Sequence, residues 1–225
     1  MSLTGADQTK RAIAAIKILR KATKGMVDPA ANQLIDIYGR KPYLILISCL
    51  LSLRAKDFTT VLVSQELFKY VRTPQQMLKI PTKKLEKLIF SIGFYKKKAR
   101  LLHSVSQDLI KRFGGKVPKT KKELLSIDGI GQKTANLVLA EAYGIPGICV
   151  DTHVHRVSNR LGLVKTKTAD QTEKALEKII PKKYWIELNP LFVMWGQQVC
   201  TPISPKCSTC AISQLCPKIG VTKHR

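Results

Sequence analysis

Acidic residues are scarce in this chain. Its 225 residues include 15 Asp and Glu against 39 Lys and Arg, which gives a formal net charge of +24 at pH 7. This excess favours a polyanionic partner, because neutralising phosphates releases counterions and dominates nucleic-acid affinity. A long apolar run is also missing. The longest one, 43–53, is far shorter than the ~20 residues that span a bilayer, so we expect no membrane insertion.

The N-terminal sequence lacks the apolar core and the small-residue cleavage pattern of a secretion signal. The basic, apolar-periodic segment 7–24 has some features of a mitochondrial transit helix, but an ordinary amphipathic helix is favoured. Six cysteines, four of them clustered, fit a reducing compartment better than a disulfide framework. We therefore expect a protein that is not secreted, located in the cytoplasm or nucleoid, or in the nucleus if the source is eukaryotic.

Strand-like alternation is scarce, and so are internal repeats. Apolar residues recur with a helical period, and Pro or Gly marks most of the short breaks between periodic segments. The sequence therefore predicts an all-α protein, with Asp57 and Asp151 as N-caps. The expected helices are 7–24, 28–39, 43–53, 57–71, 74–79, 82–91, 95–113, 120–126, 132–143, 152–162, 169–180 and 185–199.

Four cysteines near the C-terminus have the spacing C-x6-C-x2-C-x5-C. Such a group binds either Zn²⁺ or an iron–sulfur cluster. The second C-x2-C pair that is typical of zinc sites is missing, and the spacing is more natural for one chain that wraps around a single cubane. The predicted ligands are Cys200, Cys207, Cys210 and Cys216.

A glycine turn precedes a predicted helix at 132–143. Gly129 and Gly131 allow backbone N–H groups to approach a phosphate, and the N-terminus of the helix favours negative charge there. This pattern is that of a helix-hairpin-helix, which contacts the nucleic-acid backbone without reading its sequence. Similar turns also join ordinary helices.

Two residues near this turn are candidates for chemistry. Lys133 lies in the first turn of its helix, where the helix dipole disfavours an ammonium, so it is a candidate amine nucleophile for Schiff-base formation. Otherwise it is one more phosphate-binding lysine. Asp151 is an N-cap by default, but its carboxylate could also stabilise a developing cation or move a proton. His153 and His155 are two residues apart on a predicted helix, so we expect no metal pair.

These motifs together resemble the endonuclease III family of iron–sulfur DNA glycosylases. The resemblance is carried by GIGQKTA at 129–135, VDTHVHRV at 150–157 and the four-cysteine pattern, and it extends upstream through LLSLRAKD at 50–57 and IGFYKKKA at 92–99. It covers roughly residues 30–217. No other family known to us combines these motifs in this order.

The resemblance implies a two-domain helix-hairpin-helix glycosylase fold. A six-helix barrel domain would cover 35–145, and a second domain would combine 1–34 with 146–225 and carry a [4Fe-4S] cluster on the four cysteines. The substrate would be double-stranded DNA with an oxidised pyrimidine flipped into a cleft between the domains, or with an abasic site. Lys133 would attack the sugar C1′ and form a Schiff base, and β-elimination would cut the strand on the 3′ side. Asp151 would stabilise positive charge at the sugar.

The resemblance also implies where DNA is contacted. Family members often carry Gln where Arg54 stands and an aliphatic wedge where Phe94 stands, so the preference for the opposite base is expected to differ. Asp128 replaces a common proline and would weaken the grip on phosphate. The expected DNA contacts are Arg54, Phe94, Gly129, Ile130, Gly131, Gln132 and Thr134, and the substrate pocket would include Ser52, Asp57 and His153.

Three other functions fit parts of the sequence. A mismatch-specific monofunctional glycosylase would typically lack Lys133. A non-catalytic iron–sulfur DNA-binding protein would not need both Lys133 and Asp151. A zinc-ribbon RNA-binding protein would be colourless, whereas an iron–sulfur protein is brown. We expect the bifunctional enzyme of base excision repair, acting as a monomer.

Overall fold

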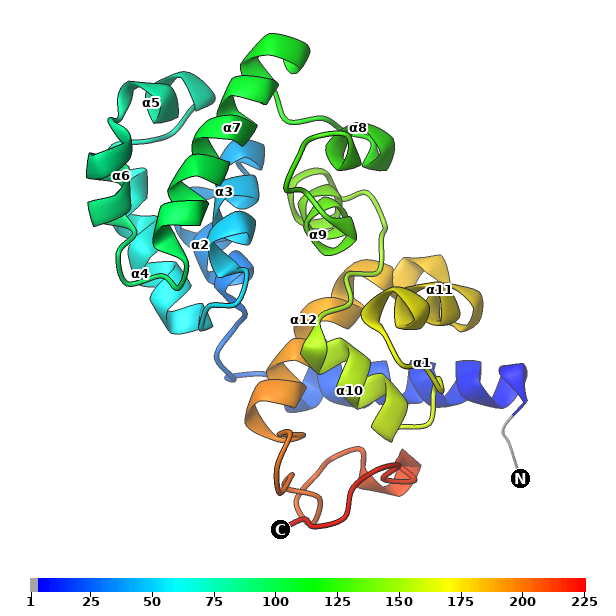
Figure 1. Ribbon diagram of the computed structural model, residues 1–225. Helices are drawn as coiled ribbons and strands as arrows, with labels where there is room; N and C mark the ends of the chain where they lie inside the picture. The colour runs from blue at the N-terminus through cyan, green and yellow to red at the C-terminus, as the bar shows by residue number, and fades with distance from the viewer. Residues whose placement is uncertain (1–3) are drawn as a thin grey trace. The chain divides into compact units, whose positions relative to one another are not determined.

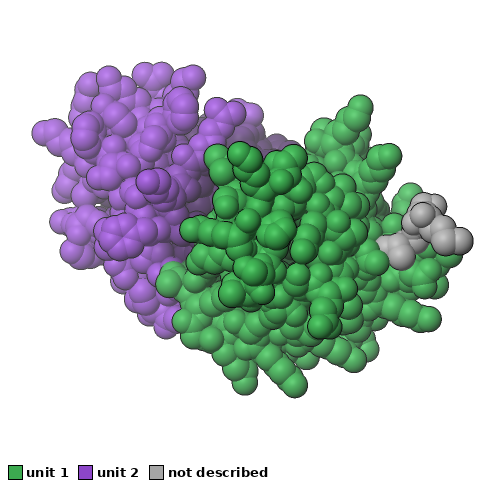
Figure 2. Space-filling view, turned by 90° about the horizontal axis from the view of Figure 1, so that it is seen from below, with its two compact units in different colours: residues 1–28, 146–225 green, residues 29–145 purple. Residues whose placement is uncertain are grey.

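The computed structural model describes residues 4–225, which contain helices and no strand (Figure 1). The chain divides into two compact units, coloured separately in Figure 2. Residues 29–145 form the central unit, and residues 1–28 and 146–225 form the terminal unit. The boundary expected after residue 34 would cut α2 (Ala30–Tyr38), which packs in the central unit as one helix.

The central unit is built around α3 (Pro42–Ser52). Every residue of this helix from Tyr43 to Leu51 is buried, because its sequence is apolar on all sides. It packs against α2, α4 (Asp57–Phe68), α7 (Tyr95–Phe113) and α9 (Gln132–Tyr143). A helix that is surrounded in this way forms the core of the unit.

Shorter helices complete the central unit. Helices α5 (Pro74–Lys79) and α6 (Thr82–Leu88) pack against α7, and α8 (Lys121–Leu125) packs against α9 (Figure 1). The amphipathic helix α7 ends at Gly114, which has the left-handed conformation that glycine adopts without strain.

The terminal unit joins the two ends of the chain. Helix α12 (Trp185–Gln198) packs against α1 (Gly5–Ala22) and α10 (Thr152–Arg160), and α11 (Ala169–Ile179) contacts α1 and α10. The helices η1 (Lys182–Tyr184) and η2 (Ser213–Leu215) are 3₁₀ turns, the second within the loop that follows α12. The apolar core includes Ile16, Leu19, Phe192 and Trp195.

The helix ends agree with the sequence to within a few residues, but one cap was wrong. Asp57 is not the N-cap of α4. It is the first helical residue, after the N-cap Lys56. Its Oδ2 accepts a hydrogen bond from the backbone N–H of Ala30 at 3.3 Å, so this carboxylate satisfies the start of α2 instead. Within residues 4–225, no helix is long and apolar enough to cross a membrane.

Candidate functional site

The glycine hairpin lies between α8 and α9 in the central unit. Gly129 has a φ of 83°, and a Cβ added there would lie 2.2 Å from Cδ1 of Leu101. Gly131 is the N-cap of α9 and makes no side-chain cap hydrogen bond. The first N–H groups of a helix have no acceptor within it, so this uncapped N-terminus suits an anion.

The side chains of the hairpin differ in their exposure. Gln132 is exposed and Lys133, in the first turn of α9, is half-buried. Ile130 and Thr134 are buried, with exposed fractions of 5% and 4%. These two side chains therefore face the core of the unit, and the DNA contacts expected of the hairpin stay a prediction.

Arg54 and Phe94 lie side by side at the ends of two helices. Both residues are exposed and left-handed, with φ of 55° and 60°, and the Arg54 guanidinium carbon lies 5.9 Å from the centre of the Phe94 ring. A Cβ added to Gly93 would lie 3.8 Å from the carbonyl oxygen of Arg54. Non-glycine residues with such φ values are uncommon and strained, and this strain clusters at functional sites. Nearby Ser52 donates its hydroxyl to the carbonyl of Cys49 at 2.8 Å.

Asp151 is the N-cap of α10 in the terminal unit, as the sequence predicted. Its Oδ1 accepts hydrogen bonds from the N–H groups of His153 and Val154, both at 2.8 Å. These bonds fix the carboxylate at the start of the helix, where the dipole favours negative charge. The ring of His153 packs on Gly196 of α12, and its Nδ1 lies 3.0 Å from the guanidinium of Arg156.

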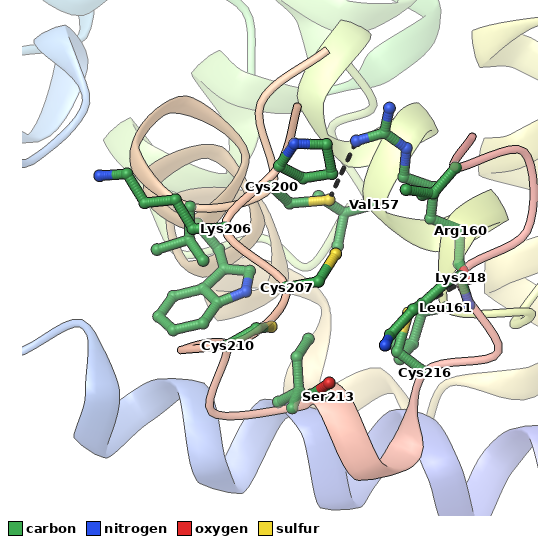
Figure 3. Close-up of a pocket in the computed structure, with 15 residues that line it drawn as sticks. Val157, Arg160, Leu161, Cys200, Lys206, Cys207, Cys210, Ser213, Cys216 and Lys218 are labelled. Atoms are coloured by element: carbon green, nitrogen blue, oxygen red, sulfur yellow. Dashed lines mark hydrogen bonds between the residues drawn. The ribbon is translucent and has the colours of Figure 1, made fainter. Parts of the chain in front are cut away.

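The four cysteines of the C-terminal loop line one small pocket (Figure 3). None of them forms a disulfide. No group of three or more His, Cys, Asp or Glu among residues 4–225 is arranged to hold a single metal ion. The pocket has apolar walls that include Val157 of α10 and Leu161, the C-cap of that helix.

Two arginines of α10 donate hydrogen bonds to the cysteine loop. Arg160 donates to the Cys200 sulfur at 3.4 Å and to the carbonyls of Thr201 and Pro202, each at 2.7 Å (Figure 3). Arg156 donates to the carbonyl of Cys200 at 3.0 Å. The sequence analysis missed both residues, although their i, i+4 spacing beside Asp151 was a signal that they share one helix face.

The chemistry of the pocket favours a metal centre with several thiolates. Burial raises the pKa values of Cys210 and Cys216, and the neighbouring thiols raise them further. The thiolate forms of Cys210 and Cys216 would therefore need a cationic centre to stabilise them. The indole Nε1 of Trp195, another lining residue, is buried beside Cys210 and has no hydrogen-bond partner of good geometry. It is therefore available to donate to a sulfur that accepts hydrogen bonds better than a thiol does.

The expected site residues thus fall into three groups. Gly129–Thr134 form one hairpin and Arg54 with Phe94 form a second surface feature, both in the central unit. Asp151, His153 and the cysteines belong to the terminal unit. Asp57 stabilises α2 through Ala30.

Comparison with known proteins agrees with these features. Residues 47–182 match the model of the HhH-GPD superfamily, described as base excision DNA repair proteins. Endonuclease III of Thermotoga maritima is 39% identical over 196 residues, which are 85% of this chain and 92% of that protein. Endonuclease III of Bacillus subtilis is 36% identical over 80% of this chain and 83% of its own. A solved non-covalent endonuclease III–DNA complex is similar with a TM-score of 0.84 and 34% identity, covering 96% of each chain.

The chain belongs to the HhH-GPD superfamily of base excision DNA repair proteins and, within it, to the endonuclease III family. Its activity is accordingly that of a DNA glycosylase with AP lyase activity.

Proposed function

We propose that this enzyme removes oxidised pyrimidines from duplex DNA and then cuts the strand 3′ to the abasic site. The observation that carries this proposal is Lys133, an amine in the first turn of α9 directly after an uncapped glycine hairpin. The hairpin is suited to a DNA phosphate, which would bring the sugar of the damaged nucleotide close to this amine. The target base would be flipped out of the stack, since the sugar C1′ is otherwise inaccessible.

Lys133 supplies the nucleophile. Its uncharged Nζ would form a bond to C1′ as the C1′–N bond to the base breaks, and the base would leave with the bonding electron pair and take up a proton. The nitrogen lone pair then forms a C1′=N bond as the C1′–O4′ bond breaks and O4′ takes up a proton, which opens the sugar ring and gives a protonated Schiff base. Removal of a C2′ proton then breaks the C3′–O bond and releases the strand on the 3′ side, which leaves with a 5′-phosphate, and water hydrolyses the C=N bond to free Lys133 from the sugar remnant.

Asp151 would stabilise the positive charge that develops at the sugar and assist proton transfer. One of its oxygens, Oδ1, already accepts two backbone N–H bonds, which fix the orientation of the carboxylate. This leaves the charge and the lone pairs of Oδ2 for the reaction. Asp151→Asn keeps the capping acceptor and removes the charge, so it tests the chemical role separately from the fold.

DNA contact would be divided between the hairpin and the Arg54–Phe94 pair. The backbone of Gly129, Gly131 and Gln132 would hold a phosphate. The exposed Arg54 and Phe94 would enter the base stack and occupy the space left by the flipped base. A monomer acting on genomic DNA, in the nucleoid or the nucleus, is sufficient for this function.

Cys200, Cys207, Cys210 and Cys216 would hold a [4Fe-4S] cluster. When bound, the cluster would join the ends of the C-terminal loop by four metal–thiolate bonds and so hold the loop in one conformation. The four thiols that line one pocket, the arginines around them and the indole of Trp195 support this assignment. Iron and acid-labile sulfide in equal amounts support it, whereas zinc in the purified protein would contradict it.

Borohydride trapping tests the reaction. Duplexes with thymine glycol and with a preformed abasic site are each incubated with enzyme and reductant. Wild type should give a covalent adduct with both, and Lys133→Gln with neither, while DNA binding persists. Asp151→Asn should slow base removal severely. Lys17→Gln, an exposed lysine of α1, is the control for the loss of one positive charge.

Each other outcome has a distinct meaning. An adduct with the abasic duplex alone keeps the lyase and excludes thymine glycol as the substrate. Base loss without any adduct favours a monofunctional glycosylase and reduces Lys133 to a phosphate contact. Binding without base loss or an adduct favours a non-catalytic DNA-binding protein.

A further inference from the structure

Lys98 is the buried lysine of a basic helix. Of the lysines and arginines in residues 4–225, it alone is buried, with an exposed fraction of 6%. Its neighbours Lys96, Lys97 and Arg100 on α7 are exposed. Lys98 shares its helix face with Leu102, four residues later, so its stem follows the apolar stripe into the unit. Burying an ammonium is unfavourable unless its donors find acceptors, so the contacts of Nζ indicate why a lysine is there.

Nζ of Lys98 donates to two backbone carbonyls, those of Leu51 and Leu53, each at 2.7 Å. Both carbonyls lie at the C-terminal end of α3. The last carbonyls of a helix receive no hydrogen bond from an N–H of the same helix, and the helix dipole favours a cation there. Two other carbonyls there are also bonded. Ser52 donates its hydroxyl to Cys49, and the N–H of Ala55 donates to Ser52. Lys98 therefore completes the end of α3 from a different helix.

The residue that follows these carbonyls is Arg54, and the first turn of α7 begins just after Phe94. The backbone N–H of Lys98 donates to the carbonyl of Phe94 at 3.0 Å. Lys98 is thus bonded to both members of the pair or their segments. Its side chain binds the segment that presents Arg54, and its backbone N–H binds Phe94. Arg54 and Phe94 are both left-handed, a conformation that persists only where the surroundings impose it.

We propose that Lys98 is a positioning residue that holds Arg54 and Phe94 in the geometry needed to enter the base stack. This inference rests on the proposed function, since it assigns the pair to the space left by a flipped base. Lys98 itself is buried and touches neither DNA nor the reacting atoms.

Lys98→Met is the first variant, because it removes the donors and the charge but keeps an unbranched apolar stem. Single-turnover excision of thymine glycol from duplex DNA should fall about 10- to 100-fold, the loss typical of a misplaced group near the reaction. Cleavage of single-stranded abasic DNA should stay near the wild-type rate, because that substrate has no opposite base and no stack to hold open. Lys17→Met controls for net charge.

A double-mutant cycle separates positioning from a general structural role. In an Arg54→Ala, Phe94→Ala background, Lys98→Met should have little further effect on excision, because residues that act as one unit are not additive. Fluorescence of 2-aminopurine opposite the lesion reports stacking directly. It should show a disrupted stack with wild type and less disruption with Lys98→Met.

Equal losses on both substrates, or a full effect of Lys98→Met in the double-alanine background, would overturn the proposal. If Lys98→Met does not fold, the cycle is run with Lys98→Gln, whose amide can donate to one carbonyl, and a loss of excision that persists in full in the double-alanine background would also overturn it. Wild-type enzyme that neither excises nor traps would instead refute the proposed function.

Discussion

Replacing Gly129 with alanine should destabilise the central unit and displace the glycine hairpin. Two separate features of the structure oppose a side chain there. The φ of 83° lies in the region that residues with a Cβ rarely adopt, and the new Cβ would lie 2.2 Å from Cδ1 of Leu101. Leu101 is itself partly buried against the core of the unit, so it cannot move away freely.

The two effects can be estimated. A left-handed alanine costs about 1–2 kcal/mol, and an overpacked methyl group costs about 1–3 kcal/mol more. Alanine also restricts the unfolded chain, which returns about 0.4–1 kcal/mol. We expect the free energy of unfolding to fall by about 1–5 kcal/mol, the sum of these contributions.

Gly131→Ala is the matched control within the same hairpin. Its φ is −91° and a Cβ added there meets nothing within 4 Å, so its stability should stay within about 1 kcal/mol of wild type, the limit expected for an N-cap glycine. Urea unfolding of both variants, and of Gly129→Ala combined with Leu101→Ala, measures the difference. The second substitution should recover the part due to the clash. Equal stability of the two glycine variants, or no coupling with Leu101, would refute this reasoning.

Three further predictions follow from individual contacts. Asp57→Ala should lower the free energy of unfolding by about 0.5–2 kcal/mol, as for a lost cap. It should also speed hydrogen exchange at the first turn of α2, and unchanged exchange there would contradict the contact with Ala30. Burial raises the pKa of Glu141 and Arg40 opposes this. Arg40→Met should therefore lower the free energy of unfolding by about 1 kcal/mol at pH 8, and by less as the pH falls through the raised pKa of the folded carboxyl. A pH-independent loss in urea unfolding would exclude this pairing. Burial lowers the pKa of Lys98 to about 8. Between pH 8 and about 10 the unfolded chain therefore binds more protons than the folded one. The free energy of unfolding of wild type should rise relative to that of Lys98→Met as the pH increases in that range.

Much of the fold was predictable because helix periodicity and punctuation agree along the chain. The glycine hairpin, Lys133 and the N-cap Asp151 were found from local sequence, since each depends on residues that are near in the chain. Asp57 shows the limit of such reasoning. An acid before an apolar run is typical of an N-cap, but a neighbouring helix start can use the same carboxylate, and only the packing of α2 against α4 decides which.

The buried polar contacts could not be predicted from the sequence. Lys98 stands in a run of three lysines, and its charge alone places it on the surface. Its spacing with Leu102 was a signal that it faces inward, but its two acceptors lie 45 and 47 residues away in the chain. Ile130 and Thr134 illustrate the converse, because a motif that the sequence predicts as a DNA-binding turn also contains residues that face the core.

Helix α10 has only nine residues, and its two ends serve different purposes. Asp151 begins it, and Arg160 at its last position is bonded to three groups of the cysteine loop. So short a helix is not stable alone in water, and it depends on tertiary contacts at both ends. Oxidative damage that loosens the loop should therefore fray α10 from its C-terminus and weaken the cap at its N-terminus. The Asp151 carboxylate would then lose its fixed orientation without being modified itself. With the role proposed for Asp151, oxidation of the thiols would therefore lower the rate of base removal.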